Sequence, residues 1–185
     1  MQTLGLDIST SNIGIVILDN EQKLIHAEAL AIKKLKSFHE KAAFVKESIK
    51  KVNKKFDIKS IAIEQNLQAF RPGFSSAKTL FTLARFNGVV TYLLHEEFKL
   101  DVTEINVNHA RKVVGLKINR KSESSTKEQV LDWVSSRDLG GFSWPKRKVT
   151  RGKRAGHVIF TEECYDIADA YVIAAASLYE SRSTT

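Results

Sequence analysis

Two acidic residues of this 185-residue chain lie in segments that otherwise read as buried strands. Asp7 lies mid-strand, at one of the positions that alternate with Leu4, Leu6 and Ile8, and Glu64 directly follows the apolar run 61–63. An ionised carboxylate in such surroundings costs several kcal/mol of folding free energy unless a charged partner or a metal ion compensates it. Both positions are therefore candidates for chemistry.

A second pair of acids lies near the end of the chain. Asp166 and Asp169 are three residues apart, so they share one face of the helix predicted there, where like charges repel. A hard divalent cation such as Mg²⁺, which prefers oxygen ligands, would remove the cost of all four carboxylates at once. Singly, each acid also fits a turn cap, an ion pair or a solvated helix face. Together, and with the motifs described below, they favour a metal site.

Lysine and arginine outnumber the acidic residues by 29 to 21, which gives a net charge of +8. This surplus favours a polyanionic partner, nucleic acid before an anionic membrane, although extra lysine also serves solubility alone. Cys164 is the only cysteine, which excludes an intrachain disulfide and a zinc site built on several thiolates. The first residues do not resemble a signal peptide, and the apolar stretch 171–179 is too short to span a membrane. We therefore expect an intracellular, soluble protein.

The spacing of apolar residues predicts an α/β fold in a single domain over residues 1–185. Three strands joined by tight polar turns come first and indicate an antiparallel meander, after which helices alternate with further strands. The segment 135–160 has weak periodicity and reads as a loop, basic over about 140–157. Strands are predicted at 3–9, 13–18, 23–32, 60–65 and 102–107, and helices at 38–56, at 75 or 76 to about 98, at 108–115, from Ser125 and from Thr161. Capping boxes mark two helix starts, at Ser37 with Glu40 and at Ser125 with Glu128.

The four acids stand in segments that resemble the motifs of RuvC-type Holliday junction resolvases. Residues 4–14 (LGLDISTSNIG) resemble the first motif of this family and are also similar to the first nuclease motif of RNA-guided CRISPR enzymes. Residues 61–65 (IAIEQ) resemble the second motif, and residues 166–170 (DIADA) resemble the last. The family's long helix, its basic segment and the helix start that follows are resembled by residues 83–88, 108–115 and 125–130. This ordered set covers nearly the whole chain.

The resemblance implies an RNase H-like fold, in which a mixed five-stranded sheet of three antiparallel and then two parallel strands is flanked by helices. It also implies a homodimer that resolves four-way (Holliday) junctions by paired nicks, using two Mg²⁺ ions per active site, with Mn²⁺ as a substitute. Asp7 would bridge both ions, Glu64 would serve one, and Asp166 and Asp169 would complete the shells. The product would carry a 5′ phosphate and a 3′ hydroxyl. Lys127 matches a basic residue of the family that would stabilise the transition state, although a solvated lysine is the alternative.

Contacts to branched DNA are predicted from three groups of residues. The basic loop leads directly into the helix that carries Asp166 and Asp169, so phosphates bound there would lie near the metal ions. Two further basic residues lie in the helix at 108–115. The aromatic that wedges into a junction in the family matches Leu67 most directly, while the aromatics around Arg71 follow a little later. The predicted contacts are Phe70, Arg71, Phe74, Arg111, Lys112, Lys146, Arg147, Lys148, Arg151, Lys153 and Arg154.

Three functions other than a junction resolvase match part of this pattern. A broader nuclease of the same fold would act on flaps, forks or RNA–DNA hybrids, and the long basic loop favours it. A DNA-binding module without catalysis conflicts with the complete set of acids. Sugar kinases and Hsp70-like ATPases have a similar first motif, but they need a second lobe that this chain is too short to hold. The expected compartment is the cytoplasm or nucleoid, or the host cytoplasm if the source is a virus, and an organelle is a further alternative.

Overall fold

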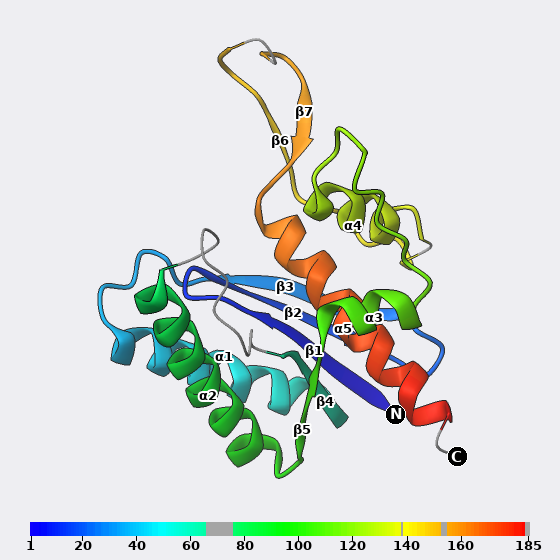
Figure 1. Ribbon diagram of the computed structural model, residues 1–185. Helices are drawn as coiled ribbons and strands as arrows, with labels where there is room; N and C mark the ends of the chain where they lie inside the picture. The colour runs from blue at the N-terminus through cyan, green and yellow to red at the C-terminus, as the bar shows by residue number, and fades with distance from the viewer. Residues whose placement is uncertain (66–75, 138, 153–154, 184–185) are drawn as a thin grey trace.

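A mixed five-stranded sheet forms the centre of the computed structural model, which describes residues 1–65, 76–137, 139–152 and 155–183 (Figure 1). The strands lie in the order β3-β2-β1-β4-β5. The first three strands pair antiparallel, and β4 and β5 continue the sheet in parallel with β1. The strands are β1 (Gln2–Ile8), β2 (Asn12–Leu18), β3 (Leu24–Ala31), β4 (Ile58–Glu64) and β5 (Val102–Ile105). The predicted sheet, with its antiparallel meander, is confirmed.

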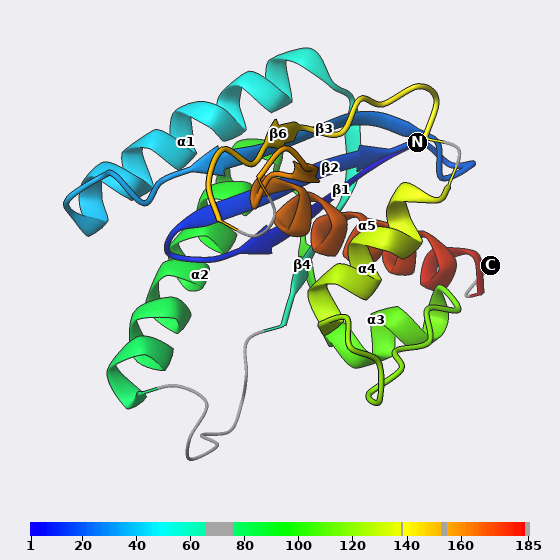
Figure 2. The same cartoon turned by 90° about the horizontal axis from the view of Figure 1, so that it is seen from above.

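Helices cover both faces of the sheet (Figures 1 and 2). On one face lie α1 (Phe38–Lys55) and α2 (Ala77–Phe98), and on the other lie α3 (Val107–Val113), α4 (Thr126–Ser135) and α5 (Glu163–Ser183). Both predicted capping boxes are present, at Ser37 and at Ser125. None of the helices in the described part of the chain is long and apolar enough to cross a membrane.

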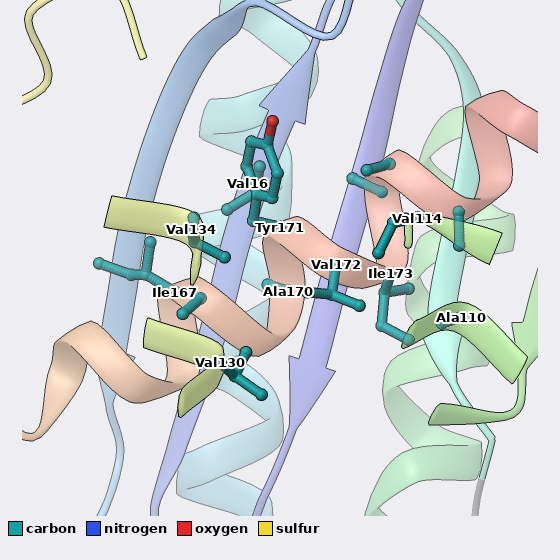
Figure 3. Close-up of a cluster of buried hydrophobic side chains, with 14 of the residues drawn as sticks. Val16, Ala110, Val114, Val130, Val134, Ile167, Ala170, Tyr171, Val172 and Ile173 are labelled. Atoms are coloured by element: carbon teal, nitrogen blue, oxygen red, sulfur yellow. The ribbon is translucent and has the colours of Figure 1, made fainter. Parts of the chain in front are cut away.

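Strand alternation divides the apolar residues between two cores. Leu4, Leu6 and Ile8 of β1 join the core beneath α1 and α2, while Val16 of β2 joins the core beneath α5. Figure 3 shows that second core, where Ile167 and its helical neighbours pack among residues from β2, α3 and α4. Because successive side chains of a strand point to opposite faces, Asp7 is directed to the α5 side of the sheet.

Two glycines allow α5 to lie directly on the backbone of β1 and β2. A Cβ atom added to Gly5 would lie 2.6 Å from the Ala170 carbonyl oxygen, and one added to Gly14 would fall far inside van der Waals contact with the carbonyl oxygen of Asp166. Any larger residue at either position would therefore force the helix away from the sheet. This close packing brings the start of α5 to the strand that carries Asp7.

The prediction of a loop over 135–160 is wrong in part. This region contains a two-stranded antiparallel hairpin, β6 (Lys146–Lys148) and β7 (Val158–Phe160), which projects beyond the sheet at the N-terminal end of α5 (Figure 1). The three residues of β6 are all basic, so no alternation marks the strand. Trp144 packs edge-on against Phe142 and Phe160, which anchors the base of the hairpin on the domain.

Smaller differences concern the ends of elements. β5 ends at Ile105, and α3 begins at Val107 because the Asn106 side chain accepts hydrogen bonds from the backbone N–H groups of Asn108 and His109. The predicted strand therefore extended two residues too far. Asp7 is the second-last residue of β1 and does not lie in mid-strand as its pattern indicated.

Candidate active site

The four acidic residues of the motifs line one cavity of about 460 Å³. Asp7 lies near the end of β1, and Glu64 is the last residue of β4. The two strands are parallel neighbours with Leu6 opposite Ile63, so both acids reach the same edge of the sheet. Asp166 and Asp169 come from the first turns of α5 and are each 8% exposed. Residues far apart in the sequence therefore meet at the edge where β1, β4 and α5 converge.

The environment of this cavity disfavours negative charge. Burial, followed by the charges of Glu64, Asp169 and Asp166, raises the pKa of the Asp7 carboxyl well above its ordinary value. Burial is also the main reason why the pKa values of Glu64, Asp166 and Asp169 are raised. These carboxyl groups thus resist ionisation unless positive charge is brought into the cavity.

Two basic residues supply part of that positive charge. Lys127, the second residue of α4, lines the cavity, and its charge lowers the pKa of each of the four acids. Arg111 of α3 also lines it, with Nη2 3.7 Å from Oδ1 of Asp169. That distance is longer than a hydrogen bond, and both Asp169 Oδ1 and Arg111 Nε are buried with no hydrogen-bond partner among the described residues.

The donor chemistry of the cavity fits a hard divalent cation. Its acidic ligands are carboxylate oxygens, the buried Oδ1 of Asp169 lacks a hydrogen bond, and the raised pKa values would be reversed by a cation. As the side chains are placed, however, no three Asp, Glu, His or Cys residues in the described part of the chain are close enough to hold one ion together. The predicted two-ion site therefore stays a prediction.

The raised pKa of Asp7 predicts how stability depends on pH when divalent ions are removed. Because the pKa is higher in the folded state, the folded chain binds more protons than the unfolded chain above about pH 4, and the contribution of Asp7 to stability falls as the pH rises. We expect Asp7→Asn to melt at a higher temperature than the unaltered protein in EDTA, by a margin that widens from pH 4 to pH 8. Thermal unfolding across this range measures it. Equal melting temperatures throughout would contradict the raised pKa.

The cavity also contains polar residues that the sequence analysis did not select. The loop between β1 and β2 contributes Ser9, Ser11 and Asn12, and α2 contributes Asn87, which is 2% exposed. Ser9 Oγ donates to the Asn12 carbonyl oxygen at 2.7 Å and accepts from the Asn12 N–H at 2.9 Å, which fixes the loop. The neighbouring amide of Asn12 favours the ionised form of Asp166 and so partly offsets the rise in its pKa. All four residues lie inside segments that resemble the resolvase motifs, and this position in the sequence could have identified them as site residues.

The predicted DNA contacts fall into three groups. Arg111 belongs to the carboxylate cavity, whereas Lys112 is exposed on α3 and does not line it. The side chains of Lys146, Arg147 and Lys148 on β6 are exposed, as is Arg151 beyond them. The remaining predicted contacts, Phe70, Arg71, Phe74, Lys153 and Arg154, lie outside the described residues.

Solved structures of Holliday junction resolvases share this fold. The chain superimposes on Thermus thermophilus RuvC in complex with a Holliday junction substrate with a TM-score of 0.68 and 16% identity, covering 99% of this chain and 96% of that one. It superimposes on the yeast mitochondrial Holliday junction resolvase Ydc2 with a TM-score of 0.57 and 14% identity, covering 96% and 77%. No protein-family model matches the chain, and no curated protein matches it in sequence. The predicted RNase H-like fold of the RuvC-type resolvases is confirmed.

Proposed function

We propose that this chain is a divalent-metal-dependent DNA endonuclease that resolves four-way junctions by paired nicks. The observation that carries the proposal is the convergence of Asp7, Glu64, Asp166 and Asp169 in one cavity beside Lys127. The same fold is found in a resolvase solved with its junction substrate, which supports this choice of substrate. Paired nicks require two active sites related by symmetry, so the proposal includes a homodimer that matches the two-fold symmetry of a four-way junction.

Each residue of the cavity has a distinct part in this proposal. Asp7, Glu64, Asp166 and Asp169 would hold two Mg²⁺ ions, which Mn²⁺ would be able to replace. Bound divalent ions supply the activation of a water for in-line attack on the phosphate and the stabilisation of the leaving 3′ oxygen. Lys127, exposed at the rim of the cavity, neutralises charge on the phosphate as it grows in the transition state.

The two basic side chains of the cavity, Arg111 and Lys127, differ in their exposure to solvent. The side chain of Arg111 is only 17% exposed and lies against Asp169, so it acts on the carboxylates from within. Lys127 is exposed at the start of α4, where the helix dipole disfavours a cation and an anionic ligand would offset that cost. We therefore assign the phosphate contact to Lys127 and the orientation of Asp169 to Arg111.

A direct test compares synthetic four-way junctions, replication forks, flaps and RNA–DNA hybrids, each with Mg²⁺ and with EDTA. We expect Mg²⁺-dependent, symmetrically placed nicks in the four-way junction, each leaving a 5′ phosphate and a 3′ hydroxyl, and slower cutting of the other substrates. Faster cutting of flaps, forks or hybrids would assign the site to a broader nuclease of the same fold. Binding without cutting under all conditions would assign the chain to a non-catalytic DNA-binding module.

Divalent ions are expected to stabilise the fold even without DNA. An ion present at a hundred times its dissociation constant adds about 2.7 kcal/mol to the free energy of unfolding, which for a chain of this length raises the melting temperature by roughly 5–10 °C. Differential scanning calorimetry with MgCl₂ or MnCl₂ measures the shift, and NaCl at the same ionic strength is the control. Asp7→Asn should lose most of the shift. A shift of the same size with NaCl would mean that the carboxylates do not bind the ion.

A further inference from the structure

A second hollow of about 450 Å³ adjoins the carboxylate cavity. Asn12, the first residue of β2, lines both, so the two spaces lie on either side of it. One side of this second hollow is the turn that carries Lys33 and Lys34, and the other side includes Arg147 of β6. Three cations from two distant segments thus face a space that opens beside the four acids. We call this hollow the lysine groove.

The lysine turn is fixed to the loop that separates the two spaces. The N–H of Ile32 donates to the Ser11 carbonyl oxygen at 2.9 Å, and the N–H of Leu35 donates back to the Ile32 carbonyl oxygen at 3.1 Å. Lys41 Nζ of α1 donates to the carbonyl oxygen of Thr10. The backbone of the turn is therefore bonded to the loop beside the carboxylate cavity, which places the two exposed lysines next to that cavity.

The opposite side of the groove is fixed as well. Arg147 pairs with Ile159 in the β6–β7 register, and the Thr161 N–H donates to the Pro145 carbonyl oxygen at 3.1 Å. Cys164 Sγ donates to the same carbonyl oxygen at 3.2 Å. These bonds join the base of the hairpin to the start of α5, so Arg147 stands at a defined place beside the helix that carries two of the four acids.

We propose that the lysine groove binds the sugar–phosphate backbone of the DNA strand that enters the carboxylate cavity. This inference rests on the proposed nuclease function and extends it, because Lys33 and Lys34 were not among the contacts predicted from the sequence. Phosphates bound along the groove would continue past Asn12 to the phosphate that is cut. The lysines would contribute phosphate contacts without reading sequence.

Two acids limit where phosphates can lie in the groove. Glu162 and Glu163 line its end at the start of α5, and Glu163 Oε2 accepts a hydrogen bond from Thr161 Oγ1 at 2.9 Å. Like charges repel phosphates from these two acids, so a bound backbone is expected to lie between the lysine turn and Arg147 and away from Glu162 and Glu163.

The test measures binding of a synthetic four-way junction by Lys33→Gln/Lys34→Gln, with and without Arg147→Gln, all in an Asp7→Asn background that prevents cutting. We expect the triple change to weaken binding by at least about tenfold and to make the slope of log K against log salt shallower by about 2 to 3, at roughly 0.9 per phosphate contact. Lys51→Gln/Lys54→Gln on α1 removes two exposed lysines away from both spaces and is the matched control. Equal losses for the groove variant and the control would overturn the proposal.

Single methylphosphonate substitutions in the junction locate the contact. A methylphosphonate has no charge, so at the phosphate that the groove holds it should weaken binding of the junction by the protein with an unaltered groove. It should not weaken binding by Lys33→Gln/Lys34→Gln any further, because the substitutions in the protein and the change in the DNA remove the same contact. We expect this non-additivity at positions beside the cleaved phosphate on the same strand. Additive losses at every position would refute the strand path. A chain that does not bind junctions at all would instead refute the proposed function, so the two failures are distinguishable.

Discussion

Asp7→Asn is expected to lower the rate of junction cleavage by at least about a thousandfold, which corresponds to roughly 4 kcal/mol of transition-state stabilisation. The amide has nearly the shape of the carboxyl group but no charge, so it occupies the same place between Leu6 and Ile8. A neutral amide is a poorer ligand for a divalent cation than a carboxylate, so the site would hold its ions weakly. Affinity for the junction should stay the same or rise, since the change removes a negative charge that faces the phosphate.

Single-turnover cleavage and gel-shift binding of the same junction measure the two parts of this expectation. Asp101→Asn is a suitable control, because its fully exposed carboxylate does not line the cavity and its one ion pair among the described residues is a 4.0 Å contact with His95. That variant should cut at the rate of the unaltered protein. Asp7→Asn that retained a tenth of the activity would show that catalysis does not depend on this carboxylate, and the assignment of the site would be lost.

The parts of the fold that the sequence could predict are those governed by local rules. Strand alternation in β1 and β4 and the capping boxes at Ser37 and Ser125 are set by residues within a few positions of one another. The spacing of Asp166 and Asp169 likewise placed both acids on one helix face. These local features do not indicate which side chains meet, because the parallel pairing of β1 with β4 joins distant segments. The meeting of the four acids was predicted from the resemblance of their segments to the resolvase motifs.

The parts that could not be predicted depend on contacts between distant segments. The β6–β7 hairpin forms because Trp144 and Phe160 pack together and because the start of α5 bonds to Pro145, and none of this leaves a period in the sequence. Lys33 and Lys34 look like ordinary surface lysines until the Ser11–Ile32 hydrogen bond places their turn beside the active-site loop. Charge patterns alone therefore identified the basic residues around β6 but not the hairpin that they form, and they missed the opposite side of the groove.

The roles of Gly5 and Gly14 could be predicted only in part. Both occur in the first motif, and each looks like an interruption of an apolar strand. The structure explains why glycine is needed at both positions: the backbone of α5 occupies the space where a side chain would be. The depth of the α5 contact therefore sets how far Asp166 and Asp169 stand from Asp7.

Gly14→Ala should consequently impair both stability and activity. The new methyl group would overlap the Asp166 backbone, so α5 must shift away from β2, at a cost of about 1–3 kcal/mol for overpacking. If this shift displaces the carboxylates of Asp166 and Asp169 by about 1 Å, the folded molecules should also cleave the junction about a hundredfold more slowly. Cleavage is therefore measured well below the melting temperature, at a temperature where circular dichroism shows the variant to be folded.

Gly88→Ala provides the matched comparison for this result. Gly88 lies within α2, and a Cβ atom added there meets nothing within 4 Å. Alanine in a helix interior is favoured over glycine by up to about 1 kcal/mol, so this variant should melt at a higher temperature and cut at an unchanged rate. The same chemical change at two glycines thus has opposite expected effects. If Gly14→Ala were as harmless as Gly88→Ala, the close contact between α5 and β2 would not be what positions the acids.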